Sequence, residues 1–276
     1  MQQRENCLVP DHSRCDSGDG LDGQLLQPQV SPADVHGFSL RRDEDGKEQK
    51  LKTRKYQHHT GVKGSTRNHK GSVDPEICMH LDVTSPRVWV TPEGGDRVMC
   101  DTQTDGGGWI VIQRRTHGET NFNRSWEEYK VGFSGEKGDE FYIGNKVLEA
   151  LSRSSALVLR VDLIHKRLKY FQKYKDFRVS DEARSYSLCV VDWSGTAGDG
   201  LTPGDDHWQS VVASVPFSTY DHPGMCSSSD QGGWWSKGCD SSNLNGEWKG
   251  GVRWYRLTSG DDAITFTEMK VRPDTN

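Results

Sequence analysis

The sequence predicts an α+β domain with a central, mainly antiparallel sheet, short helices and a loop-rich C-terminal lobe. Apolar and polar residues alternate over 157–163 and again over 171–179, as expected of strands with one buried face. Two short segments, 126–130 and 146–151, follow residues that can cap a helix. From residue 195 onward the chain is rich in Gly, Ser, Asp and Pro, which favours loops over regular structure.

The apolar run 109–113 begins just after a glycine triplet and predicts a buried strand. Ser125 is expected to cap the first helix, because Glu128 stands three residues later, as in a capping box. Asn145 is expected to cap the second helix. The last strand, 265–271, is expected to return to the central sheet.

Aromatic residues divide the chain into two parts. All nine tryptophans follow residue 88, whereas residues 1–77 contain only Phe38 and Tyr56 as aromatics. Those first 77 residues offer too little apolar area to offset the roughly 1–2 kcal/mol per residue that backbone ordering costs. We therefore expect a disordered polar leader over 1–77 and a folded domain over 78–276.

Charge and motif content argue against several classes of function. Residues 78–276 carry 23 basic and 28 acidic side chains, so the domain lacks the basic excess of a nucleic-acid binder. No apolar run approaches the ~20 residues that a membrane-spanning helix needs. No nucleophile–base motif, phosphate-binding loop or paired metal-ligand cluster indicates an enzyme.

The most distinctive segment is residues 230–246, which read DQGGWWSKGCDSSNLNG. Aperiodic loops of this kind often form binding surfaces. The segment resembles the signature of fibrinogen C-terminal domains, the module shared by fibrinogen chains, ficolins, tachylectins, angiopoietins, angiopoietin-like proteins and tenascins. Other blocks resemble this family in the expected order between about residues 78 and 273, including CDTQTDGGGW at 100–109 and EMKVRP at 268–273.

Four of the seven cysteines have partners implied by the resemblance. It pairs Cys78 with Cys100 and Cys226 with Cys239. Either bridge closes a short loop and would stabilise the domain by roughly 2–4 kcal/mol through its effect on the unfolded protein. The alternatives are that these cysteines are reduced or form a zinc site, but the spacings do not match those of common zinc motifs.

The other three cysteines have no partner implied by the family. Cys189 lies in the apolar run 186–191, which predicts a buried strand, and we expect it to be a small core residue with a free thiol. Cys7 and Cys15 in the leader either link chains into a homo-oligomer or pair with each other.

The resemblance also raises the question of calcium. Family members commonly bind it through an Asp-x-Asp-Asn-Asp-like loop shortly after Phe-Ser-Thr, and calcium takes about six to eight oxygen ligands. Here Asp221 matches the first ligand, but Pro223 occupies the second position and the loop is shortened. Asp221 is the sole side-chain ligand carried over, so the sequence does not predict a tight site.

In lectin-like relatives the recognition pocket lies beside the residue that corresponds to Cys239. There a cis peptide before the cysteine aims backbone N–H groups at an acetyl or carboxylate group, which implies such a bond between Gly238 and Cys239. Asp240 replaces the family's usual histidine, and Asp230 matches an acid that fibrinogen uses in its knob-binding hole. These two acids favour a basic ligand, or they cap turns. Trp248 is expected to form an apolar wall of a shallower pocket.

A glycosylation sequon is formed by Asn123, Arg124 and Ser125. It adjoins aromatic residues that we expect to be buried, so the sequence leaves the occupancy of Asn123 open.

The resemblance implies a secreted, non-enzymatic recognition protein. The first hypothesis is lectin-like binding of a glycan or pathogen surface, of the innate-immunity type. The alternatives are an angiopoietin-like ligand for a cell-surface receptor and an extracellular-matrix component. Residues 1–7 lead into polar sequence without the apolar core of a signal peptide. We interpret the sequence as a mature fragment or an incomplete gene model of an extracellular protein, with cytosolic residence as the alternative.

Overall fold

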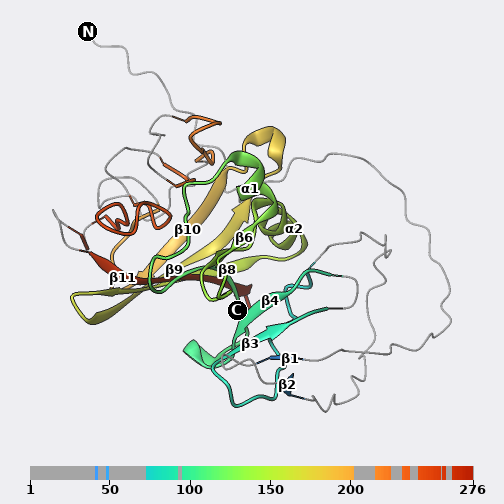
Figure 1. Ribbon diagram of the computed structural model, residues 1–276. Coiled ribbons are helices and arrows are strands. Elements are labelled where there is room, and N and C mark those ends of the chain that lie inside the picture. The colour runs from blue at the N-terminus through green and yellow to red at the C-terminus, as the bar shows by residue number, and fades with distance from the viewer. Residues whose placement is uncertain are drawn as a thin grey trace, which may run out of the picture.

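The computed structural model describes part of the protein, namely residues 41–42, 48–49, 73–92, 95–201, 215–224, 232–236, 242–255, 257–258 and 263–275. Within the predicted leader it describes a short antiparallel pair, β1 (Arg41–Arg42) and β2 (Glu48–Gln49), which lies beside strand β3 (Figure 1). Val73 is already buried in the core, five residues before the expected start of the domain at residue 78.

A nine-stranded sheet forms the centre of the domain. Its main path runs in the order β10-β9-β8-β11-β5-β4-β3, and β6 and β7 pair at its side. All of its pairings are antiparallel. The strands are β3 (Arg87–Val90), β4 (Val98–Asp101), β5 (Trp109–Arg115), β6 (Phe133–Ser134), β7 (Phe141–Tyr142), β8 (Leu157–His165), β9 (Leu168–Val179), β10 (Leu188–Gly195) and β11 (Ile264–Pro273).

The last strand completes the middle of the sheet. β11 pairs with β8 on one side and with β5 on the other, which confirms its predicted return. The segment between these neighbours in the sequence contributes the helices and two short strands. The sheet is therefore continuous only when the two ends of the domain come together.

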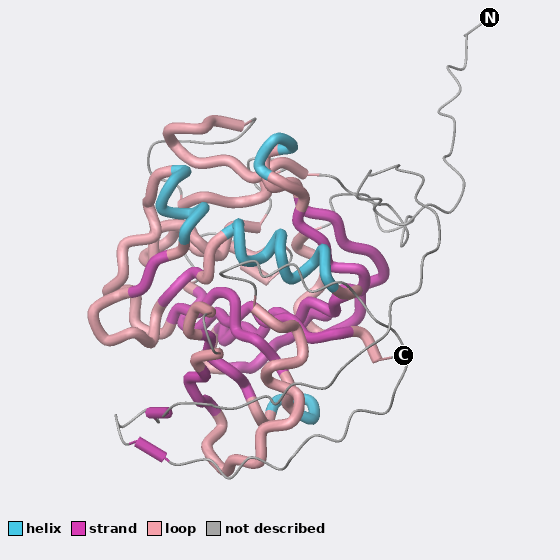
Figure 2. Tube along the Cα trace, turned by 90° about the vertical axis from the view of Figure 1, so that its right-hand side faces the viewer, coloured by secondary structure: helices cyan, strands magenta, loops and turns pink. Residues whose placement is uncertain are grey.

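Two α-helices, α1 (Trp126–Val131) and α2 (Asn145–Ser154), cover one side of the sheet (Figure 2). Two 3-10 turns, η1 (Thr104–Gly106) and η2 (Glu182–Arg184), complete the described helical structure. No helix in the described part of the protein is long and apolar enough to span a bilayer.

The two helix starts differ from each other. α1 has the predicted capping box: Ser125 accepts from the Glu128 N–H, and the Glu128 side chain accepts from the Ser125 N–H. Asn145 is not the cap of α2, contrary to expectation. It is the first helical residue, and its buried side chain accepts from Tyr142 Oη at 2.6 Å. The Asn145 side chain therefore binds Tyr142 instead of capping the backbone of the helix.

The core lies between the sheet and the helices. Alternate residues of β8 are buried, which confirms the predicted period of two. The inward side chains of β8 and β9 form one cluster with Leu148 and Leu151 of α2. Trp234 and Trp235 belong to the same cluster and are 1% and 3% exposed, so they pack the core instead of presenting a binding surface.

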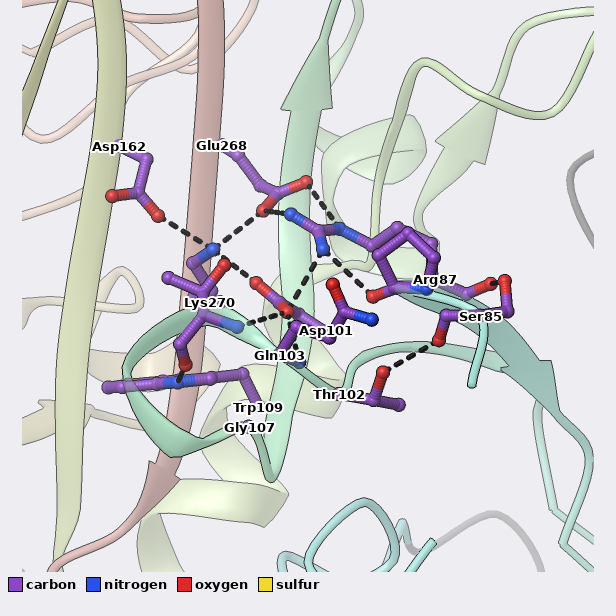
Figure 3. Close-up of polar contacts among 12 residues, drawn as sticks. Ser85, Arg87, Asp101, Thr102, Gln103, Gly107, Trp109, Asp162, Glu268 and Lys270 are labelled. Carbon is purple, nitrogen blue, oxygen red and sulfur yellow. Dashed lines mark hydrogen bonds and ion pairs between the residues drawn. The ribbon is translucent and has the colours of Figure 1, made fainter. Parts of the chain in front are cut away.

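The opposite face of the sheet carries a buried ion layer centred on Lys270 (Figure 3). The Lys270 Nζ lies 2.6 Å from Asp101 Oδ2, 2.6 Å from Asp162 Oδ2 and 2.7 Å from Glu268 Oε1. Arg87 joins the layer by pairing with Asp101 at 2.9 Å and with Glu268 at 2.7 Å. β11 is thus held to β4 and β8 by charge on this face and by apolar packing on the other.

Protonation of these carboxyls is strongly disfavoured. Burial alone would raise the pKa of Asp101, but the Lys270 charge and hydrogen bond oppose it, and the pKa is lowered to about 2. Burial acts on Glu268 in the same way, and Lys270 together with Arg87 lowers its pKa. The buried charges are matched, as such groups must be to remain ionised.

The cysteines in the described residues are all oxidised. Cys78 and Cys100 form a disulfide that ties the segment before β3 to β4. Cys189 is also disulfide-bonded, so the prediction of a free thiol is wrong. A buried position predicts an inert thiol, but β10 is an edge strand and its side chains can reach segments beyond the sheet. The partner of Cys189 lies outside the described residues.

Candidate ligand-binding lobe

We call the described residues 215–224, 232–236 and 242–255 the C-terminal lobe. They contain no regular helix or strand, and isolated bridges hold them together, such as Ser218 with Trp234 and Asn243 with Arg253. Polar side chains replace the missing ladders. Asn245 Nδ2 donates to the Gly233 carbonyl at 2.8 Å, and Asn243 Nδ2 donates to the Gly232 carbonyl at 3.3 Å. The Asn-Leu-Asn-Gly turn at 243–246 is thus bonded to the glycine pair at 232–233.

The sheet fixes this turn through Gln113 of β5. Gln113 Nε2 donates to Asn245 Oδ1 at 3.1 Å and to the Leu244 carbonyl at 3.2 Å. Thr267 Oγ1 of β11 donates to Gln113 Oε1 at 3.0 Å, which orients the amide. All of these groups are buried, so each bond also satisfies a polar group that water cannot reach.

Arg115, two residues further along β5, supports the same turn with a buried charge. Its Nη1 donates to the Leu244 carbonyl at 3.2 Å and also to the Gly246 carbonyl. The guanidinium lies over the rings of Phe122 and Trp248, 4.3 and 5.0 Å from their centroids. Burial lowers the pKa of Arg115 to about 10, which leaves it charged at neutral pH.

The predicted wall residue, Trp248, rests on the loop that follows β5. A Cβ on Gly118 would lie 2.0 Å from the Trp248 ring, and the Gly118 φ is +75°, so only glycine fits here. Trp248 itself is half-buried. Its indole is therefore held between Gly118 and Arg115 and still reaches the surface.

Glu140 shapes this supporting loop from beneath. Its buried carboxylate accepts four backbone N–H bonds, from residues 116, 117, 118 and 120, at 2.7–2.9 Å. Burial alone would raise the pKa of Glu140, but these four donors lower it to about 2. A single carboxylate thus holds the loop that supports Trp248.

Hydrogen bonds within the protein hold the turn at 219–222. Thr219 and His222 exchange two backbone hydrogen bonds, at 3.0 and 3.2 Å. Asp221 Oδ1 accepts from the Trp126 backbone N–H at 2.9 Å and from Thr219 Oγ1 at 2.7 Å. The His222 ring lies over the Trp126 ring, with centroids 4.0 Å apart. This turn is joined to the start of α1.

Several oxygen atoms of this turn are already used in hydrogen bonds. One oxygen of the only retained carboxylate, Asp221, already accepts two hydrogen bonds, and the Thr219 and His222 carbonyls are used within the turn. Among the described residues, no group of three or more His, Cys, Asp or Glu could hold a metal ion.

Most other predicted site residues lie outside the described part of the protein. This applies to Asp230, Gly238, Cys239 and Asp240, and so to the implied cis bond and to the pairing of Cys239 with Cys226. Asn123 is described and exposed, next to the buried Phe122.

Three supports of the lobe, Gln113, Arg115 and Glu140, were not predicted from the sequence. For Gln113 and Arg115 the available sequence signal was that an apolar strand ends in the polar residues Gln-Arg-Arg. Such residues ordinarily indicate the end of a strand, and here Arg115 is 2% exposed.

The fold and this geometry agree with comparisons to known proteins. The family model for the C-terminal globular domain of fibrinogen beta and gamma chains matches residues 81–274, more than half of the sequence. The chain belongs to the fibrinogen C-terminal domain family. The predicted resemblance and fold class are thereby confirmed.

Curated relatives of this fibrinogen-family domain include larger proteins. Fibrinogen-like protein 1 of Bos taurus is 40% identical over 199 residues, covering 64% of this chain and 63% of the relative. Tenascin-R of Homo sapiens is 38% identical over 187 residues, covering 64% of this chain and 13% of the relative. The chain thus spans less than two thirds of the length of these relatives.

Solved fibrinogen-like domains show the same fold. The fibrinogen-like globe domain of human ANGPTL2 matches with a TM-score of 0.59 and 32% identity, over 69% of this chain and 93% of that one. Lamprey fibrin D-dimer, complexed with the peptide Gly-His-Arg-Pro-amide, matches with a TM-score of 0.56 and 27% identity, over 65% of each chain.

Proposed function

We propose that this chain is an extracellular, non-enzymatic recognition domain whose C-terminal lobe binds a glycan in the manner of a lectin. The observation that carries the proposal is the anchoring of the lobe. Gln113 and Arg115 fix the turn at 243–246 to the sheet, and Trp248 stands beside it at the surface. A rigid loop platform with an aromatic ring suits recognition, because little entropy is lost on binding.

The cysteines support the extracellular part of the proposal. Cys78 and Cys100 form a disulfide, and Cys189 is also oxidised. Disulfides persist outside the cytosol and are rare within it. The cytosolic alternative therefore has the weaker support.

The ligand-contacting residues in this proposal are Trp248 and the four signature residues Asp230, Gly238, Cys239 and Asp240. In the sequence these four flank the anchored segment 232–236. Two acids among them favour a ligand that carries a basic group, such as an amino sugar.

We further propose that recognition does not need calcium. Asp221 Oδ1 accepts from the Trp126 N–H and from Thr219 Oγ1, so donors of the protein itself already hold this carboxylate in place. The melting temperature measured with millimolar calcium or with EDTA should be the same. A calcium-dependent rise in melting temperature would overturn this part of the proposal.

A protein ligand is the second candidate. The lamprey fibrin relative was solved with a peptide that contains histidine and arginine, and two acids in the signature suit a basic peptide. In this case the protein would act as a ligand for a cell-surface receptor or as a matrix component.

A glycan array, with and without calcium, separates these candidates. The lectin proposal expects saturable binding to particular glycans, lost in Trp248→Ala and kept in the matched change of another half-buried indole, Trp193→Ala on β10. No binding on the array, with saturable binding to cells that resists glycosidase treatment, would favour the protein-ligand candidate instead.

Two modifications belong to the same proposal. The exposed Asn123 would carry an N-linked glycan, which a mass shift on glycosidase treatment would reveal. Cys7 or Cys15 would link chains into a homo-oligomer, which non-reducing electrophoresis of the full chain tests.

A further inference from the structure

The β8–β9 hairpin concentrates positive charge in an acidic protein. Residues 165–175 contain five Lys or Arg and no Asp or Glu, whereas the whole chain has a net charge of −5. This hairpin projects from the sheet at the left of Figure 1. A local excess of this size creates a positive potential that attracts anions.

Strand geometry places much of this charge on the outer face of β9. Lys169 pairs with Ile164 and Lys173 with Arg160, whereas Gln172 and Tyr174 are buried on the inner face. Lys175 is exposed further along the strand. Lys169 and Lys175 are six residues apart, so the row extends over about 20 Å of strand.

Several of these charges are not neutralised within the described protein. Arg167, Lys169 and Lys175 are exposed and form no ion pair with any described residue. Lys173 contrasts with them, because its Nζ lies 3.3 Å from Asp105 at the rim of the ion layer. Among the described residues, the face therefore combines the paired Lys173 with an outer row, Arg167, Lys169 and Lys175, that forms no ion pair.

The turn at the hairpin tip is unfavourable for its residues. Lys166 and Arg167 alone connect β8 to β9, and their φ angles are +50° and +65°. A two-residue turn of this kind favours Asn-Gly, because both positions lie in the left-handed region. Strained positions of this kind are concentrated at functional sites, and here one of them places the exposed Arg167 at the hairpin tip.

We propose that the hairpin tip and the outer face of β9 bind a sulfated glycosaminoglycan. The charges form a row instead of converging, so one phosphate or sulfate would meet a single cation. An extended polyanion meets all of them along the strand. The site uses none of the residues assigned to the C-terminal lobe, so in this proposal the hairpin holds the protein in an extracellular matrix while the lobe binds its own ligand.

The test uses immobilised heparin and the full chain. The unaltered protein should be retained at about 0.1 M NaCl and elute with added salt. The variant Arg167→Asn, Lys169→Thr, Lys175→Thr should elute at lower salt and bind free heparin roughly tenfold more weakly, since each lost contact also reduces counterion release. Asn and Thr suit the left-handed turn position and the strand positions respectively.

A matched control removes three positive charges elsewhere. Lys137→Ser, Lys146→Ser, Arg153→Ser lowers the net charge equally and should leave the elution salt unchanged. Equal shifts for both variants, or no retention of the unaltered protein, would overturn the proposal. Retention on immobilised polyglutamate but not on heparin would also overturn it, in favour of an acidic polypeptide. Binding through the C-terminal lobe is independent of every one of these outcomes.

Discussion

Buried charged residues determine the shape of the candidate lobe. Arg115 and Glu140 are 2% and 0% exposed, and both use their charge to hold backbone groups of irregular loops. A loop without ladders must have its buried polar groups satisfied in some other way. Arg115 donates hydrogen bonds to buried carbonyls on one side of Trp248, and Glu140 accepts them from backbone N–H groups on the other.

Replacing Arg115 with methionine should destabilise the domain. Methionine fills much of the volume but leaves the Leu244 and Gly246 carbonyls without their donor, so the free energy of unfolding should fall by roughly 2–3 kcal/mol. Urea denaturation followed by tryptophan fluorescence measures the change. The exposed Arg153→Met is the control and should stay within about 0.5 kcal/mol of the original. Equal stability of the two variants would contradict the anchoring role.

Glu140 should make stability depend on acid pH. Its pKa is lowered to about 2 in the folded state, against an ordinary value of 4.5, so its contribution is fully present above pH 4.5. That contribution should be lost as the pH falls from 4.5 toward 2. Glu140→Gln should cost roughly 2–3 kcal/mol at neutral pH and little near pH 2. Urea denaturation at a series of pH values between these limits checks this, and an equal cost at every pH would refute it.

At the scale of elements, the turn of the β8–β9 hairpin contains two residues that disfavour its backbone conformation. The pattern of residues predicted both strands, but the two-residue turn was not foreseen because Lys-Arg is not a turn signal. The strand register, with His165 opposite Leu168, forces both turn residues to positive φ. Tertiary pairing has overridden the local preference.

Relieving this turn should stabilise the protein. Lys166→Asn with Arg167→Gly places favoured residues at both positive φ positions and should raise the free energy of unfolding by roughly 1–2 kcal/mol. Lys166→Gln with Arg167→Gln removes the same charges without relieving the backbone, and should not stabilise. Thermal unfolding of both variants decides the matter. An equal rise in stability in both variants would mean that loss of charge, and not relief of the backbone, causes the effect.

Across the whole molecule, the ion layer and the apolar core act on opposite faces of β11. Lys270 lies against three carboxylates, each within 2.7 Å of its Nζ. Replacing a buried ion by an apolar group leaves its partners uncompensated. The layer therefore needs all of its members in place, with β11 between β5 and β8.

Lys270→Met should be among the most damaging single changes. With Asp101, Asp162 and Glu268 left beside each other, the loss should be roughly 3–5 kcal/mol at neutral pH. It should shrink in acid, because the buried carboxyls of Asp101 and Glu268, whose pKa burial raises once Lys270 no longer opposes it, take up protons in the variant. Denaturation under the two conditions measures both effects. A loss that does not depend on pH would indicate a packing defect alone.

Much of this architecture could be predicted from sequence. Period-two patterning located β8 and most of β9, the capping box located α1, and the return of the last strand to the central sheet was expected. The cap of α2 and the state of Cys189 could not be predicted, because each depends on a partner outside its own element. The anchors of the lobe were missed for the same reason.

The central place of β11 has a consequence for biosynthesis. A protein is made from its N-terminus, so β5 and β8 emerge from the ribosome well before the strand that separates them. Until residues 264–273 are made, the two halves of the sheet have no common neighbour. Asn123 is synthesised long before that point, so an oligosaccharide would be attached to it while the domain is still open. In the proposed glycosylation, the order of translation would thus let the modifying enzyme reach Asn123 before folding closes the sheet.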